Sequence, residues 1–470
     1  MTGVDAPGGR EGGLDGLEGA AELAAVEAQL NQRWPETKLE PSLDRIAALV
    51  DVLGSPQRAY PVLHVAGTNG KTSTARMIDA LLTALGLRTG RYTSPHLQSV
   101  TERISLDGAP VSARRYVDAY HEIAPYVAMV DKQSAERGQP QLSKFEVLTG
   151  MAFATFADAP VEAAVVEVGL GGSWDATNVV DGAVAAVTPV GVDHVEFLGT
   201  DVAGIAAEKA GIIKPTSIAV LAAQPPEVSS VLLARCAEVD ATVAREGLEF
   251  GVLARELAVG GQRLRLQGLG GVYDEIFLPL HGAHQASNAV VALAAVEAFF
   301  GAGASRQLDI EAIVQGFAAV SSPGRLERLR AAPTVFADAA HNPHGARALA
   351  AALRSEFGFR RLVAVVATMR DKDARGILAE LEPVVEEVVV SQNTSPRALD
   401  VDELAAVAVE LFGPDRVAVE PRLDDALESA VRLAEHVDEG DTALAGAGVV
   451  ITGSVVTAGE ARTLFGKAPG

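Results

Sequence analysis

The stretch HVAGTNGKTST, residues 64–74, decides the fold of the first half of the chain. It follows an apolar run and leads into ARMIDALLTALG, so it predicts a strand, a glycine-bearing turn and then a helix. The turn is a shorter variant of the standard phosphate-binding loop, which has a glycine where Val65 stands here. Its backbone amides and the helix N-terminus attract phosphate, while Lys71 reaches the terminal phosphates and the Thr72 hydroxyl reaches Mg²⁺. Alone, the loop fits a kinase, a motor, a GTPase switch or a ligase.

The same alternation of strand and helix continues to about residue 300. Near-continuous apolar strands separated by helices predict an α/β fold with a parallel sheet covered on both faces. Residues 249–280 break this rhythm and predict a small antiparallel insertion, and the alternation resumes beyond a Ser-, Pro- and Gly-bearing junction. We therefore predict a smaller, Rossmann-like second domain. The predicted parts are a disordered tail over residues 1–16, a phosphate-loop ATP-binding domain over 17–320, a hinge linker over 321–330 and the second domain over 331–470.

Composition excludes several classes of protein. The chain has 470 residues, 48% of them hydrophobic and 21% charged, which is too long for a single core. A formal charge of −22 excludes a large electrostatic interface with nucleic acid. The sequence shows neither a signal peptide nor the roughly 18 uninterrupted apolar residues that a membrane-spanning helix needs. Its one cysteine, Cys236, cannot form an intramolecular disulfide. We expect a cytoplasmic protein with no membrane partner.

Three strand ends carry side chains that could bind a metal. A proline after Ser94 stops regular structure and frees the serine hydroxyl, Glu167 ends an apolar strand, and Asp193 and His194 follow the next strand. Because parallel strand ends meet at one edge of a sheet, these groups would lie beside the phosphate loop, where oxygen ligands suit Mg²⁺. Each residue taken singly is equally compatible with an ordinary loop carboxylate or a hydrogen-bonded histidine.

Zinc is not expected. The pairs His281/His284 and His341/His344 have the spacing of zinc ligands, but no cysteine or HExxH context accompanies them.

A set of motifs in fixed order carries a family resemblance. They are AGTNGKTST, YTSPHL with TERI, SKFEVLT, VVEVGLGG followed by WDATN, DHVEFLG, AAEKAGIIKP, HQASN, SSPGRLE and DAAHNPHGA. Over about residues 40 to 455 the chain resembles folylpolyglutamate synthase and dihydrofolate synthase, members of the Mur ligase superfamily. The resemblance implies ATP-dependent amide formation, in which a substrate carboxylate becomes an acyl phosphate and L-glutamate displaces the phosphate. The acceptor would be dihydropteroate, a reduced folate, or both, and the second domain would be the glutamate-ligase domain.

The resemblance also implies roles for particular residues. ATP would be held by Gly67, Thr68, Asn69, Gly70, Lys71, Thr72, Asn288, Arg325 and Asp338. Thr72, Ser94 and Glu167 would hold one Mg²⁺, His194 a second, and Lys209 would join as a metal ligand once CO₂ converts its amine to a carbamate. The groups that act in catalysis would be Lys71, carbamylated Lys209, His194, Arg325 and His341. A monovalent cation is a further implied cofactor.

The pterin part of the acceptor has two implied contact segments. They are Ser143, Lys144, Phe145 and Glu146, and then Trp174, Asp175 and Ala176. Phe145 and Trp174 could stack on a flat heterocycle, although each is equally compatible with a core aromatic. Ser173 stands where the family commonly has an arginine, so a bidentate side chain is missing. This departure predicts that Ser173→Arg changes the acceptor KM more than the ATP KM.

Two other functions compete with the folate ligase. A cell-wall ligase that adds an amino acid to a UDP-muramoyl peptide would share the phosphate loop, but SKFE and YTSPHL argue against it, as does the absence of a separate domain before the loop. A nucleotide-binding regulator without chemistry would have lost Glu167, Lys209 or His194, and all three are present. We expect small-molecule partners and a monomer, because one chain of this layout can hold the whole site.

Overall fold

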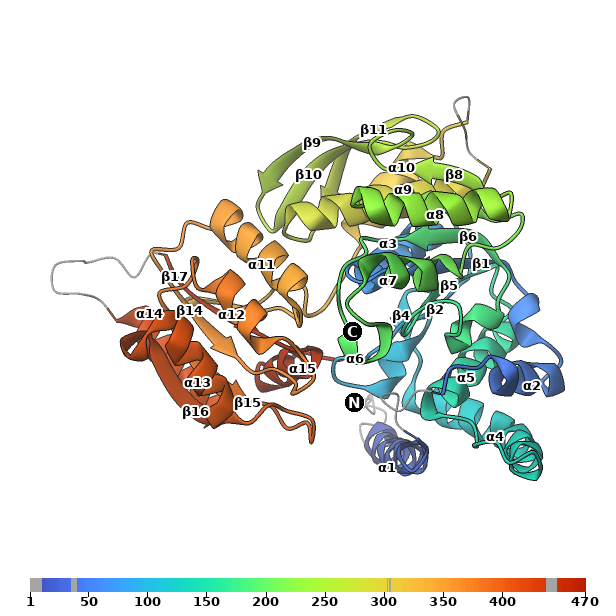
Figure 1. Ribbon diagram of the computed structural model, residues 1–470, viewed down its shortest axis with the longest axis horizontal. Helices are drawn as coiled ribbons and strands as arrows, with labels where there is room; N and C mark the ends of the chain where they lie inside the picture. The colour runs from blue at the N-terminus through green and yellow to red at the C-terminus, as the bar shows by residue number, and fades with distance from the viewer. Residues whose placement is uncertain (1–10, 35–39, 302, 304–305, 437–445) are drawn as a thin grey trace, which may run out of the picture.

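The computed structural model has two sheet-based units side by side (Figure 1). It describes residues 11–34, 40–301, 303, 306–436 and 446–470, of which 11–18 are described by backbone alone. The N-terminal unit comprises the elements from α1 to α10, and the C-terminal unit those from β12 to α15. Short 3₁₀ turns lie at Pro56–Arg58, Val100–Arg103, Ala176–Val179 and Pro414–Arg416.

The N-terminal unit is built on an eight-stranded sheet with the order β4-β3-β2-β5-β1-β6-β7-β8. All neighbours from β2 to β8 pair in parallel, and β3 and β4 add an antiparallel edge. Every residue of β1 and β5 is buried, as their unbroken apolar sequences predict. The strands are β1 (Val62–Ala66), β2 (Thr89–Tyr92), β3 (Ile104–Leu106), β4 (Ala109–Pro110), β5 (Ala163–Glu167), β6 (Gly182–Val187), β7 (Ile218–Leu221) and β8 (Thr242–Arg245).

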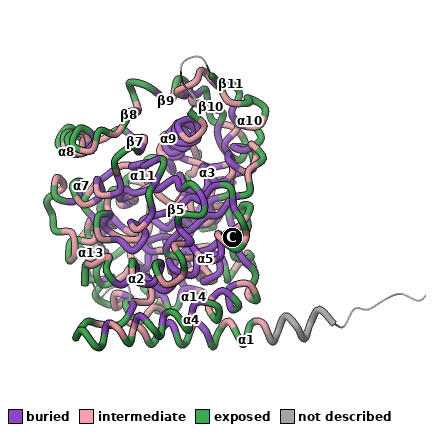
Figure 2. Tube along the Cα trace, turned by 90° about the vertical axis from the view of Figure 1, so that its right-hand side faces the viewer, coloured by how far each residue is buried: buried purple, intermediate pink, exposed green. Residues whose placement is uncertain are grey.

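Helices cover both faces of this sheet. Side chains such as Leu63 and Val65 pack against α3, α9 and α10, while Val166 on the other face joins the core beneath α2, α4 and α5. Helices α7 and α8 cover the β6–β7 end. Figure 2 shows the resulting buried interior, with exposed residues along α1 and α4. The helices are α1 (Glu11–Asn31), α2 (Asp44–Val52), α3 (Lys71–Ala84), α4 (Ala113–Glu136), α5 (Lys144–Asp158), α6 (Val195–Leu198), α7 (Val202–Ala210), α8 (Pro226–Glu238), α9 (Ala283–Phe299) and α10 (Ile310–Ala318).

The predicted antiparallel insertion is confirmed. Strands β9 (Gly251–Ala258), β10 (Gly261–Gln267) and β11 (Val272–Leu278) form a separate sheet in the order β11-β10-β9. It lies over α9 at the upper edge of Figure 1.

The C-terminal unit has a six-stranded sheet with the order β12-β13-β17-β14-β15-β16, parallel except for β12. Helices α11, α12 and α13 cover one face, and α14 and α15 the other. The α/β fold class with a second, smaller sheet is thus confirmed. The elements are β12 (Glu327–Ala331), β13 (Thr334–Ala337), α11 (Pro343–Glu356), β14 (Arg361–Val366), α12 (Ala374–Leu381), β15 (Glu387–Gln392), α13 (Val401–Phe412), β16 (Val417–Arg422), α14 (Leu423–Glu435), β17 (Ala447–Thr452) and α15 (Val455–Leu464).

Two local expectations differ from the structure. The expected linker over 321–330 contains the start of β12, because Glu327–Ala331 pairs antiparallel with Thr334–Ala337 as a hairpin edge of the second sheet. The tail expected over 1–16 lies partly outside the described residues, and from Glu11 the backbone is already helical. The Ala-, Leu- and Glu-rich stretch that follows has a high helix propensity, so the helix extends back through the glycines.

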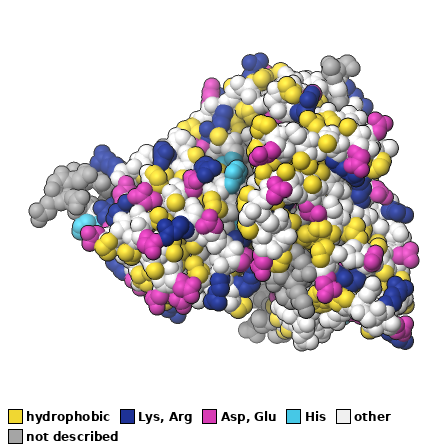
Figure 3. Space-filling view, viewed as in Figure 1, with side chains coloured by type: hydrophobic (Ala, Val, Ile, Leu, Met, Phe, Trp, Pro, Cys, Tyr) yellow, Lys and Arg dark blue, Asp and Glu magenta, His cyan; other side chains and the backbone are white. Residues whose placement is uncertain are grey.

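The two units also meet at a clamp centred on Glu356 of α11. Its carboxylate accepts a hydrogen bond from the Gly282 amide at 2.8 Å, lies 3.3 Å from Nδ1 of His281 and pairs with Arg255 of β9. We call these four residues the Glu356 clamp. On the face drawn in Figure 3, acidic and basic side chains are mixed, and histidine appears at the boundary between the units. Among the described helices, none is long and apolar enough to cross a membrane.

Candidate active site

The phosphate loop joins β1 to α3 and is held by close packing. Gly67 and Gly70 have φ angles of 145° and 88°, which favour glycine. A Cβ at Gly67 would overlap Thr188, and one at Gly70 would overlap Asn288. The Thr68 amide donates to the Pro189 carbonyl at 3.0 Å, and the Thr68 hydroxyl lies 2.9 Å from the Gly191 carbonyl. Neighbouring strand ends therefore fix the loop as an open turn at the N-terminus of a buried helix.

Glu167, at the end of β5, contacts the first turn of that helix. The Thr72 hydroxyl donates to its two carboxylate oxygens at 2.8 and 3.1 Å, and the Ser94 amide donates at 3.4 Å. The side chain is buried, and burial raises its pKa even though Lys71, Thr72 and Arg325 oppose the shift. Burial also disfavours the charged form of Lys71 and so lowers its pKa. The Lys71 ammonium donates to the Gly67 and Thr68 carbonyls at 3.1 and 3.2 Å. The structure thus brings together three predicted metal-binding residues and the loop lysine.

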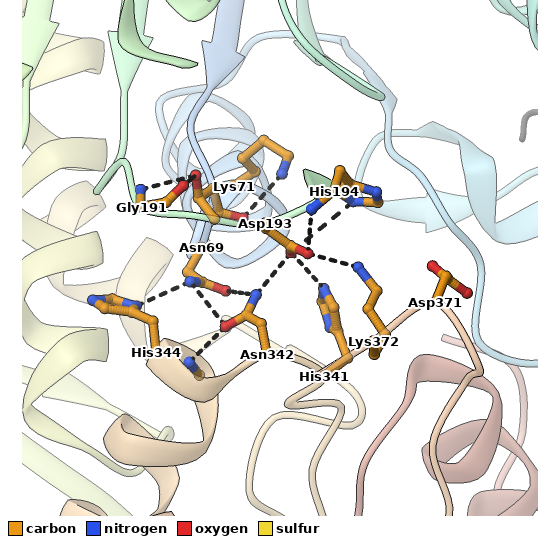
Figure 4. Close-up of polar contacts among 12 residues, drawn as sticks. Asn69, Lys71, Gly191, Asp193, His194, His341, Asn342, His344, Asp371 and Lys372 are labelled. Atoms are coloured by element: carbon orange, nitrogen blue, oxygen red, sulfur yellow. Dashed lines mark hydrogen bonds and ion pairs between the residues drawn. The ribbon is translucent and has the colours of Figure 1, made fainter. Parts of the chain in front are cut away.

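Asp193 links the two units (Figure 4). Its carboxylate accepts from Nζ of Lys372 at 2.7 Å and from Nδ2 of Asn342 at 2.8 Å, and it lies 3.4 Å from Nε2 of His341. These three groups come from the C-terminal unit. Burial would raise the pKa of Asp193, but the hydrogen bond from His341 and the positive charges around it hold the pKa well below its usual range. Asp193 is therefore an anion that attracts the C-terminal unit to the phosphate loop.

The loop itself contacts the same unit. Asn69 and Asn342 exchange side-chain amide contacts at 3.2 and 3.4 Å, and Nδ2 of Asn69 lies 2.9 Å from Nδ1 of His344 (Figure 4). Binding at the phosphate loop and the position of the C-terminal unit are thereby physically connected.

His194 and Lys209 are the other two predicted metal ligands, and Nε2 of His194 lies 4.0 Å from Oδ2 of Asp193. Burial, opposed by Asp193, lowers the pKa of His194 to about 4, so its ring is neutral at pH 7 and offers a nitrogen lone pair. Lys209 on α7 is only 4% exposed, and burial together with the nearby Lys71 lowers its pKa to about 7. A substantial fraction of Lys209 is thus an uncharged amine at neutral pH, which is the form that reacts with CO₂.

The remaining predicted nucleotide residues lie around the same boundary. Asn288 of α9 is buried against Gly70, and Arg325 lines a small cavity together with Thr72. The Asp338 carboxylate accepts from the amides of Leu326 and Ala340 at 2.7 and 2.8 Å, so it also fixes the loop that carries Arg325.

A cavity of about 250 Å³ opens beside this site. We call it the Trp174 cavity; it is lined by Ser94 and His194 at the phosphate-loop end, by Phe145, Trp174 and Asp175, and by Trp34, Arg45, Asp371 and Arg397. Aromatic side chains line it together with polar and charged ones, as expected of a site that binds a flat molecule carrying polar groups.

Asp175 is a buried carboxylate in the wall of that cavity. Its oxygens accept from the Leu170 amide at 2.9 Å, the Thr177 amide at 2.9 Å and the Thr177 hydroxyl at 2.5 Å. Because that hydroxyl donates to Asp175, the Nε2 of His64, 2.9 Å away, must be the donor to Thr177. Burial lowers the pKa of His64 to about 3, so the ring is neutral and this chain of bonds orients Asp175 without adding charge.

Comparison of the sequence with known proteins shows the family. Residues 129–296 match the Mur ligase middle domain, and residues 324–454 match the Mur ligase glutamate ligase domain. The dihydrofolate synthase/folylpolyglutamate synthase of Mycobacterium tuberculosis is 62% identical over 96% of this chain and 95% of its own length. The chain belongs to the dihydrofolate synthase/folylpolyglutamate synthase family. It is therefore an amide-forming ligase, as the resemblance implied.

Solved structures of the family have the same overall fold as this chain. The folylpolyglutamate synthase of Mycobacterium tuberculosis in complex with ADP is 60% identical and superposes with a TM-score of 0.92, covering 96% of this chain and 100% of its own. An Escherichia coli structure in complex with DHPP and ADP is 29% identical, with a TM-score of 0.80, and covers 95% of this chain and 98% of its own.

The structure separates the predicted pterin residues of this family member into two groups. Phe145, Glu146, Trp174, Asp175, Ala176 and Ser143 all line the Trp174 cavity. Ser143 and Glu146 also form the capping box of α5, and Glu146 pairs with Arg45 at 3.1 Å, so both have structural roles. Lys144 does not line the cavity: its ammonium donates to Asn31 of α1 at 2.7 Å. Lys144 points away from its sequence neighbours because successive residues of a helix face different directions.

Several residues of the site were missed from the sequence. Lys372, Asp371 and Arg397 reach it from loops after β14 and β15. Trp34, in the segment after α1, and Arg45 of α2 line the Trp174 cavity. RDKD after the strand RLVAVV was a signal that could have pointed to Lys372, because ligands in such sheets bind at strand ends. Nothing in the sequence says that this strand end faces Asp193.

Ser173 does not lie where the expected effect on the acceptor requires. Its hydroxyl donates to the Glu208 carbonyl at 3.1 Å and lies in an open groove with Lys214 and Arg235, outside the Trp174 cavity. We therefore expect Ser173→Arg to change the KM of both acceptor and ATP by less than about twofold, as for a typical surface substitution. Steady-state kinetics with each substrate varied in turn would check this, and a selective rise in acceptor KM would restore the first expectation.

The donor set fits magnesium better than zinc. Among the described residues, no three His, Cys, Asp or Glu side chains converge as a ready metal cluster. Glu167 is instead a buried carboxylate whose neighbours are the hydroxyl of Thr72 and the backbone at Ser94. One carboxylate with hydroxyls nearby is the pattern of Mg²⁺, which keeps waters and shares phosphate oxygens.

Proposed function

We propose that this chain adds L-glutamate to dihydropteroate and to the γ-carboxyl group of reduced folates. The observation that carries the proposal is the closeness of the phosphate loop to the Trp174 cavity: Ser94 lines the cavity, and its amide donates to Glu167, which also accepts the hydroxyl hydrogen of Thr72. A carboxylate at that end of a substrate held in the cavity would lie next to the terminal phosphate of ATP held by the loop.

The reaction has two steps. An oxygen of the acceptor carboxylate attacks the γ-phosphorus of ATP, ADP leaves, and an acyl phosphate forms. The amine of L-glutamate then attacks the acyl carbon, phosphate leaves, and the nitrogen loses a proton. Both steps gather negative charge at the phosphate loop, where Lys71, Arg325 and the helix N-terminus stabilise it.

We assign the metal-binding roles as the resemblance implied them. Thr72, Ser94 and Glu167 would hold one Mg²⁺, and neutral His194 with carbamylated Lys209 would hold another. Bound Mg²⁺ would neutralise charge on the phosphate oxygens. The carbamate matters because an ammonium at Lys209 would repel a metal ion, whereas a carbamate attracts it.

Nucleotide and acceptor contacts follow the same geometry. Asn288 would contact adenine, Asp338 the ribose and Arg325 the phosphates, while His341 lies at the closing boundary. In the Trp174 cavity, Trp174 and Phe145 would stack on the pterin, and the oriented Asp175 carboxylate would accept its N–H groups. The domain boundaries, a monovalent cation, a monomeric state and a cytoplasmic location stay predictions.

One assay tests the proposed function. With purified protein, ATP, Mg²⁺ and L-glutamate, we expect ADP release and glutamylated product with dihydropteroate and with tetrahydrofolate, and none with a UDP-muramoyl peptide. Mass spectrometry of the products identifies the new amide. The proposal fails if neither pterin compound is glutamylated under conditions in which the protein binds ATP.

A further inference from the structure

The Trp174 cavity has two arginines of very different character among its described lining residues. Nε of Arg45 contacts both oxygens of Glu146 at 3.1 and 3.2 Å, Nη2 donates to the Glu40 carbonyl at 3.0 Å, and the side chain is 9% exposed. Its charge is thus compensated by a buried carboxylate inside the N-terminal unit.

Arg397 is more open and comes from the other unit. It lies in the loop after β15, and its Nη2 contacts Oδ1 of Asp371 at 2.7 Å while half of the side chain, 50%, is exposed. The backbone positions this pair, because the Arg370 amide donates to the Arg397 carbonyl at 2.9 Å. A guanidinium has five N–H donors, so a contact through one nitrogen leaves the planar fork able to bind a carboxylate.

Arg397 lies at the end of the cavity where the reacting carboxylate of the acceptor would be. Asp371 precedes Lys372, whose ammonium contacts Asp193, and Asp193 precedes His194 at the phosphate-loop end. The two proposed acceptors differ at this end. Dihydropteroate has one carboxylate, the one that reacts, whereas a reduced folate has a reacting γ-carboxylate and a second, α-carboxylate that does not react.

A second carboxylate is costly to bind here without a local cation. The chain carries a formal charge of −22, and Glu40, Glu146, Asp175 and Asp371 line the same cavity. The geometry assigns Arg397 as the residue that binds the α-carboxylate of a glutamyl group on the acceptor, and thereby sets the use of reduced folates relative to dihydropteroate. This inference rests on the proposed function.

The test is Arg397→Met, assayed with both acceptors at saturating ATP. We expect the KM for tetrahydrofolate to rise about 10- to 100-fold, as when a charge-assisted hydrogen bond is lost, while the KM and kcat for dihydropteroate change less than about twofold. Arg397→Lys should recover part of the tetrahydrofolate KM, because it restores charge without the fork. Arg375→Met is the matched control, because Arg375 is a similarly exposed arginine that pairs with Glu410 outside the cavity. This substitution should leave the KM for both acceptors unchanged.

The outcomes separate the alternatives. A glutamate KM that rises with both acceptors, with an unchanged tetrahydrofolate KM, would show that Arg397 binds the incoming amino acid and would overturn the assignment. Unchanged kinetics of Arg397→Met with every substrate would also overturn the assignment. In that case, activity of the unsubstituted protein with both acceptors would still support the proposed function. Dihydropteroate activity in Arg397→Met shows that the variant is folded.

Discussion

Lys209→Ala should lose about 100- to 1,000-fold in kcat, the usual cost of removing one group that stabilises charge in a transition state. Lys209 is buried, and its pKa of about 7 makes it reactive toward CO₂ at neutral pH. If the working group is the carbamate, the variant has lost an anion and left a space behind it. Acetate or formate should therefore restore part of the activity of Lys209→Ala, measured as ADP release dependent on acceptor.

The matched control is Lys209→Arg, which keeps a positive charge but cannot form a carbamate. We expect it to be as inactive as Lys209→Ala and not to respond to carboxylates, because the guanidinium fills the space. Full activity in either variant would remove the carbamate from the mechanism.

The dependence on pH gives the same test without substitution. The neutral amine is the reactive form, and with a pKa of about 7 it makes up about a tenth of Lys209 at pH 6 and about nine tenths at pH 8. After removal of CO₂, reactivation at one fixed concentration of dissolved CO₂ should be about tenfold faster at pH 8 than at pH 6.

Glu167→Gln should lose about 100- to 1,000-fold in kcat/KM for ATP and yet leave a protein that folds well without metal. Burial raises the folded-state pKa of Glu167. A raised pKa means that this group favours folding below its unfolded pKa of about 4.3 and that this contribution is lost as the pH rises through the folded value. At pH 7, without metal, the carboxylate therefore costs folding free energy, and the neutral amide removes that cost.

Thermal melting distinguishes the two effects. Without Mg²⁺, Glu167→Gln should melt at or above the temperature of the unsubstituted protein, but added ATP and Mg²⁺ should raise its melting temperature far less. Glu297→Gln is the control, since Glu297 is also buried with a raised pKa but contacts Tyr273 and the amides of Leu269 and Gly270, in the insertion. Its kinetics should stay within about twofold. Equal stabilisation of Glu167→Gln by ATP and Mg²⁺ would contradict a metal role for Glu167.

One property of parallel sheets made much of the fold predictable from the sequence, together with the part of the site that lies at the ends of the N-terminal unit's strands. Strands buried on both faces are continuous apolar runs, and polar residues at their ends, such as Ser94 and Glu167, must lie at one edge of the sheet. The structure accordingly places Glu167 on Thr72 of the phosphate loop.

The rest depends on contacts between units that no local pattern encodes. Lys372 and Arg397 follow strands of the C-terminal unit, and only the packing of that unit on the first brings them to Asp193 and to the Trp174 cavity. Lys144 lies outside the lining of the Trp174 cavity, because its motif gives a position along a helix and not the direction of the side chain. The β12 hairpin edge was missed since its charged, alternating sequence lies directly after turn residues.

The Glu356 clamp has a consequence for how the two halves of the site meet. Together with the covalent connection between the units, it keeps Lys372 and His341 near Asp193 at an effective concentration set by the tether, which for short connections is of millimolar order. Assembly of the site is then a first-order event within one molecule. Dilution of the protein does not slow that assembly, whereas a change in the clamp or in the connection alters how often the two halves meet.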